Sequence, residues 1–334
     1  MRPARKSLVP ASALALALGL AACSTGTPEG SSPASEAAAG EDGDVALTFI
    51  QGVIGDNFYI SMECGVRAAA EELGGVTVTV QGPQKFDASL QQPILQSVVA
   101  TEPDAILIAP NDVTALQKPL EDASANAEIV LVDTTVEDPS FAVSEISSDN
   151  VGGGAAAFDA IKQLVPDGGQ VLVIDNQPGI STSDARVKGF EDAAAQDSAF
   201  EYVGVQYAQN QPAQAAQIVT STLQRYPDLK AIFATNIFSA EGAATGIEQA
   251  GKAGEVQVVG FDAGPAQVDA LNDGTVQAVI AQQPYDIGYQ GVEQALAAIN
   301  GEATEAQIQT GFTILTKDNL ESEEGQAAIY ASEC

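Results

Sequence analysis

Short β-branched segments alternate with alanine-rich amphipathic segments from Asp44 almost to the end of the chain, and this alternation restricts the fold more than any other feature. Runs such as 129–132 (IVLV) and 171–174 (VLVI) are apolar throughout. Strands of this kind are usually covered on both faces, as in parallel sheets. The pattern predicts nine strands: Val45–Gln51, Val76–Val80, Ala105–Ala109, Glu128–Val132, Gln170–Ile174, Tyr202–Gln206, Ala231–Ala234, Val256–Phe261 and Val276–Ala281.

Repeated strand–helix units predict an α/β protein built from doubly wound parallel sheets. Nine strands exceed one comfortable open sheet, so we expect two lobes in this chain of 334 residues. The segment 136–154 interrupts the rhythm and is expected to be an extended segment followed by a new helix, which makes it the candidate for the first crossing between the lobes. Ser239 is expected to cap the helix that follows it. A TIM barrel would show the same alternation and stays the alternative architecture.

The N-terminus has the features of an export signal. Arg2, Arg5 and Lys6 precede an apolar stretch at 8–20, which is too short to span a bilayer as a mature helix. Small residues then precede Cys23, an arrangement that resembles the lipobox of bacterial lipoproteins. We expect a lipoprotein signal peptide at 1–22, lipidation of Cys23 and a flexible linker at 23–43, which lacks Val, Ile, Leu and aromatic residues. An ordinary secretory signal cleaved near Ala22 is the alternative.

Charge and missing residue types exclude several functions. The chain has 45 acidic and 13 basic residues, a net charge of −32, which disfavours nucleic acid as a partner. The absence of histidine excludes Ser-His-Asp and Cys-His nucleophiles and HExxH metal sites. Cys64 and Cys334 remain beyond the lipobox, and two cysteines in an exported chain suggest one disulfide. Two separate thiols are the alternative, and we expect no metal and no cofactor.

Polar residues stand where predicted strands end. Asp133, Asp262 and Gln282 each follow an apolar run directly, Asn236 follows the run 231–234 after Thr235, and Asp56 lies in the loop after the first strand. One such residue is explained by a helix cap or a turn. Five at equivalent positions, from both halves of the chain, indicate more, because ligands of open parallel sheets bind beyond the carboxyl ends of the strands. They predict a shared binding cleft.

The chemistry of these residues favours a neutral polyhydroxylated ligand. Carboxylates accept hydrogen bonds, amides donate and accept, and Arg186 would add a fork of donors, so hydroxyl groups can satisfy the set. Three carboxylates with one arginine match an anion poorly. Phe58 and Tyr59 follow Asp56, and aromatic faces stack on the C–H faces of sugar rings. The alternatives are a core role for Phe58 and a surface position for Arg186.

Five short motifs, as a set and in this order, resemble the periplasmic sugar-binding proteins of bacterial ABC importers, of the ribose-binding and glucose/galactose-binding kind. They are 146–150 (ISSDN), 185–190 (ARVKGF), 234–236 (ATN), 258–262 (VVGFD) and 279–282 (VIAQ), and the resemblance covers about residues 45–317. It implies a type I periplasmic-binding fold with two lobes and three crossing segments. The implied lobes are 44–147 plus 283–312 and 148–282 plus 313–334. The implied cleft residues are Asp56, Phe58, Tyr59, Asp133, Arg186, Asn236, Asp262 and Gln282.

The sequence also departs from this family. Thr134 follows Asp133 where ribose-binding relatives have arginine, and Asn210 stands where the resemblance implies a second-lobe aromatic residue. The first strand ends in Gln51-Gly52 rather than a small hydroxyl residue, and residues 319–334 extend past the usual end of the family. The changes at Thr134, Asn210 and Gln51-Gly52 lie among the residues expected to surround the ligand and leave the identity of the sugar open. The link between the tail and Cys64 is a separate hypothesis.

The function expected from the resemblance is that of a solute-binding protein, lipid-anchored on the outer face of the bacterial cytoplasmic membrane. It would bind a neutral monosaccharide or polyol and deliver it, as a monomer, to an ABC permease. The alternative is a binding protein for a signal of autoinducer or inositol type that feeds a sensor or chemoreceptor. A transcription regulator would need a basic helix-turn-helix. An enzyme is not expected, because Gly152-Gly153-Gly154 lacks GxGxxG spacing and no acid stands in an obviously apolar setting for glycoside hydrolysis.

Overall fold

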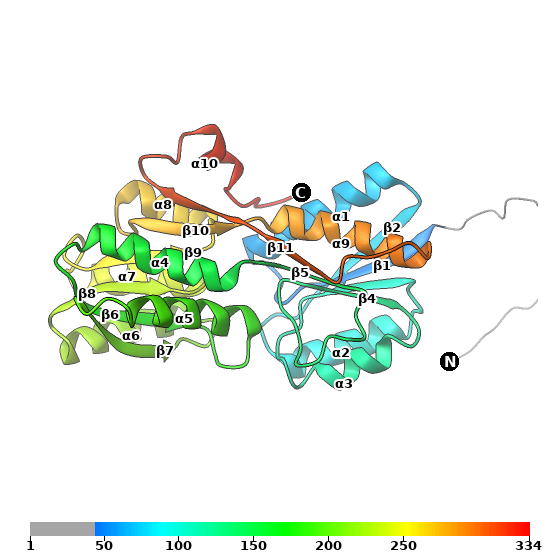
Figure 1. Cartoon of the computed structure of the whole chain (residues 1–334), viewed down its shortest axis with the longest axis horizontal. Helices are drawn as coiled ribbons and strands as arrows, with labels where there is room; N and C mark the ends of the chain where they lie inside the picture. The colour runs from blue at the N-terminus through cyan, green and yellow to red at the C-terminus, as the bar shows by residue number, and fades with distance from the viewer. Residues whose placement is uncertain (1–43) are drawn as a thin grey trace, which may run out of the picture. The chain divides into compact units, whose positions relative to one another are not determined.

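The computed structural model describes residues 44–334, so the expected signal peptide, the lipidated Cys23 and the linker lie outside the described residues. The described chain forms two six-stranded sheets with helices on both faces (Figure 1). The strands are β1 (Val45–Ile50), β2 (Val76–Gln81), β3 (Ala105–Ile108), β4 (Glu128–Val132), β5 (Ser144–Ser148), β6 (Gly169–Asp175), β7 (Phe200–Tyr207), β8 (Leu229–Ala234), β9 (Gln257–Phe261), β10 (Ala278–Gln282), β11 (Gln307–Thr310) and β12 (Phe312–Thr316). The helices are α1 (Asn57–Leu73), α2 (Ala88–Val99), α3 (Gln117–Ala123), α4 (Asn150–Leu164), α5 (Ser181–Ala194), α6 (Pro212–Arg225), α7 (Ile237–Gln249), α8 (Pro265–Asp273), α9 (Pro284–Ile299) and α10 (Glu323–Ala327).

Each sheet is the core of one lobe, and the two sheets have corresponding strand orders. Lobe 1 has the order β11-β5-β4-β3-β1-β2, and lobe 2 has β12-β10-β9-β8-β6-β7. All neighbouring strands are parallel except the edge strand β12, which is antiparallel to β10. Two open parallel-sheet lobes confirm the predicted fold class. The TIM-barrel alternative is therefore wrong.

The nine predicted strands all form, with ends shifted by a few residues, and three further strands were not predicted. The segment 136–154 was expected to be an extended crossing followed by a helix. It contains β5, which pairs with β4 and β11 and was not predicted, and the start of α4. This strand lies next to the edge strand β11, and only alternate side chains of it are buried. Its short polar sequence, SEISS, therefore lacks the apolar run by which the other strands were predicted. The edge strands β11 and β12 also lack a continuous apolar run.

The chain passes between the two sheets three times, and the crossings are hydrogen-bonded to one another. They are the connections from β5 to α4, from β10 to α9 and from β11 to β12. The Asp149 amide donates to the Thr310 carbonyl oxygen at 3.0 Å, and the Gly311 amide donates to Gln283 Oε1 at 2.9 Å. The crossings therefore form one connected strip that joins the lobes.

Glycines allow one pair of helices in each lobe to pack backbone against backbone. A Cβ atom at Gly65 of α1 would lie 2.0 Å from the Tyr285 carbonyl oxygen of α9. At the corresponding place in lobe 2, a Cβ at Gly154 of α4 would lie 2.0 Å from the Arg186 carbonyl oxygen of α5. Since real Cβ atoms do not come this close, only glycine fits. The triplet 152–154 is thus a packing element, and it brings the α5 backbone at Arg186 against α4.

Candidate functional site

A buried cleft lies between the carboxyl ends of the two sheets, with walls from both lobes. All eight residues expected at the site line it, which brings together positions up to 226 residues apart, from Asp56 to Gln282. The cavity between them has a volume of about 40 Å³. The structure thus confirms that these side chains meet, while their role in holding a ligand stays a prediction.

Asp133 and Asp262 occupy corresponding positions in the two lobes. Each follows the fourth strand of its lobe and has a left-handed backbone, with φ of 64° and 76°. The Asp133 amide donates to the Ile146 carbonyl oxygen at 2.8 Å, and the Asp262 amide donates to Ile280 at the same distance. Non-glycine residues with positive φ are uncommon and cluster at functional sites. Each lobe therefore supplies one carboxylate to the cleft by the same local turn.

The start of α1 forms the lobe 1 wall. Asp56 caps the helix, and its Oδ1 accepts a hydrogen bond from the Phe58 amide at 2.9 Å. The Tyr59 hydroxyl donates to Asp133 Oδ2 at 2.8 Å. The rings of Phe58 and Tyr59 meet edge to face, with centroids 5.2 Å apart. Phe58 is buried and also lines the cavity, so the core role and the cleft role proposed for it coexist.

Arg186 of α5 is held rigidly in the lobe 2 wall. Its Nε donates to Asn150 Oδ1 and its Nη1 to the Thr235 carbonyl oxygen, both at 2.8 Å. The guanidinium carbon lies 3.9 Å from the centre of the Phe261 ring. Only 4% of Arg186 is exposed. The surface alternative for this residue is therefore wrong, and its fixed donors and charge face a cleft rich in carboxylates.

Asn236 belongs to the cleft and also caps a helix. The helix α7 begins at Ile237, and Asn236 Oδ1 accepts from the Ser239 amide at 3.0 Å. The expected cap at Ser239 is wrong, because this residue lies inside the first turn of the helix. The side-chain nitrogen Nδ2 of Asn236 donates to Asn210 Oδ1 at 2.6 Å. Asn210, which stands where the resemblance implies an aromatic residue, thus also lines the cavity.

The remaining polar pair is Asp262 and Gln282. Gln282 Nε2 donates to Asp262 Oδ1 at 2.6 Å. The same carboxylate oxygen accepts from the Tyr330 hydroxyl at 3.0 Å. Gln282 Oε1 is buried and has no hydrogen-bond partner, and the same holds for Asn176 Oδ1 in the cavity wall. Buried acceptors without donors are costly, so these oxygens favour a ligand that donates hydrogen bonds.

Burial controls the protonation of the cleft carboxylates. Burial, followed by the negative charge of Asp262, raises the pKa of Asp56 to about 7. Burial raises the pKa of Asp133 to about 6, although the Arg186 charge acts in the opposite direction. Burial also raises the pKa of Asp262. A further negative charge would oppose all three carboxylates, whereas hydroxyl donors stabilise their ionised forms.

Sequence reasoning missed five residues in the cavity wall. Asn176 stands just after β6, so the rule that selected the other strand-end residues could have found it. Thr182 and Ser183 lie in the first turn of α5, and the preceding Gly/Ser/Thr-rich loop carries no signal that separates a ligand contact from a cap. Phe86 and Ile180 come from loops whose positions no local pattern predicts. The five missed residues are Phe86, Asn176, Ile180, Thr182 and Ser183.

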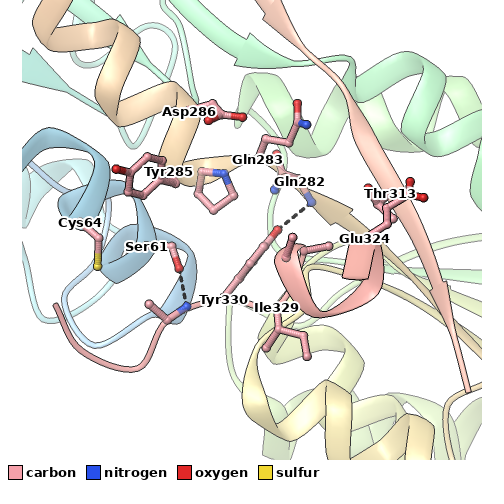
Figure 2. Close-up of a pocket in the computed structure, with 14 residues that line it drawn as sticks. Ser61, Cys64, Gln282, Gln283, Tyr285, Asp286, Thr313, Glu324, Ile329 and Tyr330 are labelled. Atoms are coloured by element: carbon pink, nitrogen blue, oxygen red, sulfur yellow. Dashed lines mark hydrogen bonds between the residues drawn. The ribbon is translucent and has the colours of Figure 1, made fainter. Parts of the chain in front are cut away.

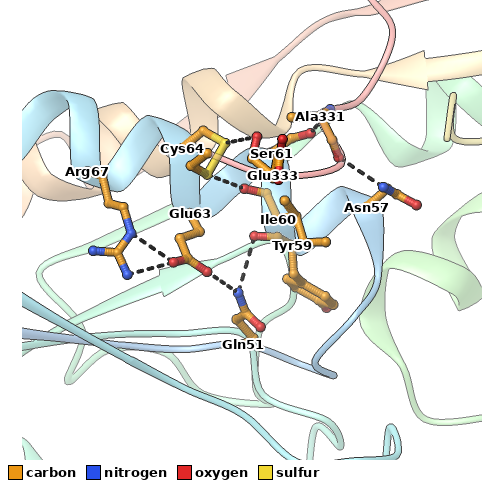
Figure 3. Close-up of a disulfide and its surroundings, with 11 residues drawn as sticks. Gln51, Asn57, Tyr59, Ile60, Ser61, Glu63, Cys64, Arg67, Ala331 and Glu333 are labelled. Atoms are coloured by element: carbon orange, nitrogen blue, oxygen red, sulfur yellow. Dashed lines mark hydrogen bonds and ion pairs between the residues drawn. A yellow bond between two sulfur atoms is a disulfide. The ribbon is translucent and has the colours of Figure 1, made fainter. Parts of the chain in front are cut away.

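Cys64 of α1 forms a disulfide with Cys334, with the two Cα atoms 5.3 Å apart, as the sequence suggested (Figure 3). The alternative of two separate thiols is wrong. Residues 44–334 contain no cluster of His, Cys, Asp or Glu that could hold a metal ion. In the same range, no helix is long and apolar enough to cross a membrane.

Two lobes, three crossings and a polar cleft between strand ends define a two-lobed binding protein. Residues 46–303 match the family model described as periplasmic binding protein domain. The ribose import binding protein of Escherichia coli is 30% identical over 272 residues, or 81% of this chain and 90% of that protein. The chain therefore belongs to the family of periplasmic sugar-binding proteins. Such relatives are binding proteins for transport, in agreement with the expectation that this protein is not an enzyme.

Solved structures show the same similarity. An ABC transporter solute-binding protein from Agrobacterium vitis, bound with α-D-tagatopyranose, is 38% identical with a TM-score of 0.84. The alignment covers 86% of this chain and 99% of that one. A carbohydrate transporter solute-binding protein from Agrobacterium radiobacter, in complex with D-arabinose, is 30% identical with a TM-score of 0.81 and covers 86% and 99% of the two chains.

Proposed function

We propose that this protein is the solute-binding component of an ABC-type importer and that it binds a neutral pentose or hexose in the cleft. The observation that carries the proposal is the cleft chemistry. Three buried carboxylates, one fixed arginine and two buried acceptors without donors suit a ligand with many hydroxyl groups and no charge. The names of the similar proteins support a monosaccharide: ribose, tagatose and arabinose occur among them.

Ligand entry requires the lobes to separate. The cavity of about 40 Å³ is far smaller than the roughly 300–1,000 Å³ of usual ligand pockets. We assign the lobes to 44–147 plus 283–312 and 148–282 plus 313–334, joined by the three crossings. Ligand would bridge Asp133 of lobe 1 and Asp262 of lobe 2 and shift the equilibrium toward the closed form. A permease would then receive the loaded, closed protein.

The expected location is outside the cytoplasmic membrane, with a lipid on Cys23 as the anchor. The Cys64–Cys334 disulfide supports export, because such bonds persist in oxidising compartments. Mass spectrometry of the protein from its native membrane tests the anchor. The expected N-terminal peptide begins at a diacylated Cys23, and an unmodified peptide that begins at Cys23 or later would refute the anchor.

Thermal unfolding against a panel of sugars tests the function. D-Ribose, D-arabinose, D-tagatose and D-fucose are compared with an anionic control, D-gluconate. A sugar at about 1,000 times its dissociation constant adds roughly 4 kcal/mol to the unfolding free energy, a shift of several degrees. The Asp133→Ala variant should lose this shift and remain folded. No shift with any neutral sugar, or a larger one with gluconate, would refute the proposal.

A further inference from the structure

The C-terminal tail, residues 319–334, connects lobe 2 to lobe 1 independently of the three crossings. It follows β12 of lobe 2, forms the short helix α10 and ends at the disulfide on α1 of lobe 1. Just before this end, the Ala331 amide donates to Ser61 Oγ at 2.7 Å, and Asn57 Nδ2 donates to the Ala331 carbonyl oxygen at 2.9 Å (Figure 3). The tail therefore has two side-chain anchors and a covalent anchor on α1.

Tyr330 of the tail reaches the back of the cleft wall. Its backbone amide donates to the Ala263 carbonyl oxygen at 3.0 Å. Its hydroxyl accepts from the Gln282 amide at 2.8 Å (Figure 2). The same hydroxyl donates to Asp262 Oδ1 at 3.0 Å. Its ring lies 6.0 Å from the Phe58 ring of lobe 1, centroid to centroid. Tyr330 is 4% exposed and does not line the cleft cavity of about 40 Å³. It contacts three residues that do, which are Phe58, Asp262 and Gln282.

The tail beside Tyr330 borders a hollow. A cavity of about 530 Å³ lies between the tail, the start of α9 and α1, and Ser61, Tyr285 and Tyr330 are among its lining residues (Figure 2). Tyr330 is held by contacts on both sides, in lobe 2 and through the end of the tail on α1. On one side these are Asp262 and Gln282, and on the other the Cys64–Cys334 disulfide.

We propose that Tyr330 is a positioning residue of the sugar site and that the disulfide holds it there; this inference rests on the proposed function. The two donors on Asp262 Oδ1, from Gln282 and Tyr330, fix the rotation of the carboxylate. The other oxygen, Oδ2, is then directed for a ligand hydroxyl. The Tyr330 contact with the Gln282 amide fixes the end of β10 in the same way, and with it the unpartnered Gln282 Oε1.

The disulfide limits how far Tyr330 can move from α1. Three residues separate Tyr330 from Cys334, so their Cα atoms are at most about 15 Å apart. While the Cys64–Cys334 bond is intact, it keeps the end of the tail on α1 and Tyr330 within this distance of Cys334, and the contacts with Asp262 and Gln282 place Tyr330 within that range. When the bond is broken, the last residues can fray and the hydroxyl can leave the carboxylate.

Isothermal titration of the purified protein tests this role, with the sugar that gives the largest thermal shift as the probe. Tyr330→Phe removes only the hydroxyl and should weaken binding by about 10- to 100-fold, the range expected for a hydrogen bond to a charged group. Tyr289→Phe is the matched control. It removes a hydroxyl that donates to Glu72 at 2.9 Å, outside the cleft, and should bind within twofold of the wild type.

The effect of disulfide reduction on sugar binding, compared between the wild type and Tyr330→Phe, separates positioning by Tyr330 from a merely structural role of the disulfide. Dithiothreitol, or Cys334→Ser, should weaken sugar binding by about 3- to 10-fold in the wild-type background. It should have no further effect in Tyr330→Phe, because the positioning contact is already lost. Because dithiothreitol is added to wild-type protein that is already folded, this measurement does not depend on whether Cys334→Ser folds.

Each outcome decides the inference. An equal loss on reduction in both backgrounds would mean that the disulfide acts without the Tyr330 hydroxyl, which overturns it. Wild-type affinity in Tyr330→Phe also overturns it, while leaving the proposed function intact. If the wild type binds none of the four sugars, the proposed function fails, and this inference fails with it.

Discussion

Replacing Arg186 with methionine removes a buried cation while keeping most of the apolar length of the side chain. The guanidinium satisfies Asn150 Oδ1 and the Thr235 carbonyl oxygen and stacks on Phe261. Asn150, Thr235 and Phe261 belong to lobe 2, so the loss acts on that lobe directly. The same charge lowers the pKa of Asp133 and Asp262 against the effect of burial. Arg186→Met should therefore weaken both the fold and the site.

The magnitude follows from these contacts. Each acceptor left without a donor costs about 1–3 kcal/mol, and the lost stacking of a desolvated cation costs about 2 kcal/mol. Because contacts that share one side chain are not additive, the expected loss of unfolding free energy is about 3–5 kcal/mol, less than the sum of the largest values. Sugar binding should become undetectable, because the Asp133 and Asp262 carboxylates lose the neighbouring positive charge.

Urea denaturation followed by circular dichroism measures the change, with Arg225→Met as the matched control. Arg225 is exposed on α6, and its guanidinium lies 5.1 Å from the Tyr226 ring. A surface substitution of this kind should change the unfolding free energy by less than about 0.5 kcal/mol. If Arg186→Met loses no more than the control, the guanidinium does not hold the lobe 2 wall together, and the reasoning is refuted.

Three further predictions concern stability. Asp56→Asn keeps the helix-capping oxygen but cannot ionise. In the wild type, the pKa of Asp56 is raised from 3.8 to about 7 on folding, so the unfolding free energy of the wild type falls as pH rises from 4 to 7. The variant should gain about 4 kcal/mol relative to the wild type over that range in urea titrations, and a constant difference would contradict the assignment. Gly65→Ala should lose about 1–3 kcal/mol because its Cβ would meet the Tyr285 carbonyl oxygen, whereas Gly311→Ala, whose Cβ has its nearest neighbour at 3.6 Å, should be near neutral. Cys334→Ser opens a loop of 270 residues and should lower the unfolding free energy by about 3–5 kcal/mol, and wild type in reductant should match it in the same denaturation assay.

Strand ends were the part of the site that the sequence predicted best. Asp133 and Asp262 follow apolar runs that are typical of buried parallel strands, and the topology of such sheets places their ends at one edge. Asn236 follows the same rule, although the cap assigned to Ser239 was wrong. The positions of Phe58, Tyr59 and Arg186 depended on the resemblance to a family as well as on their chemistry.

Tyr330 shows why the rest was missed. It lies in a polar tail beyond the repeating strand–helix pattern, 68 residues from the Asp262 carboxylate that it contacts. No periodicity or spacing predicts which side chain of such a tail returns to the core. The strands β5, β11 and β12 were missed for a related reason, because partly exposed strands lack the apolar run that marks the centre of a sheet.

The crossings also determine the order in which this chain can fold during synthesis. Lobe 1 needs α9 and β11, which end at Ile299 and Thr310, so its sheet stays incomplete until most of the chain has been made. Lobe 2 has five of its six strands by Gln282 and can assemble earlier. The Cys64–Cys334 bond uses a cysteine that follows β12 in the sequence, so this bond can form only after every strand of both sheets has been synthesised.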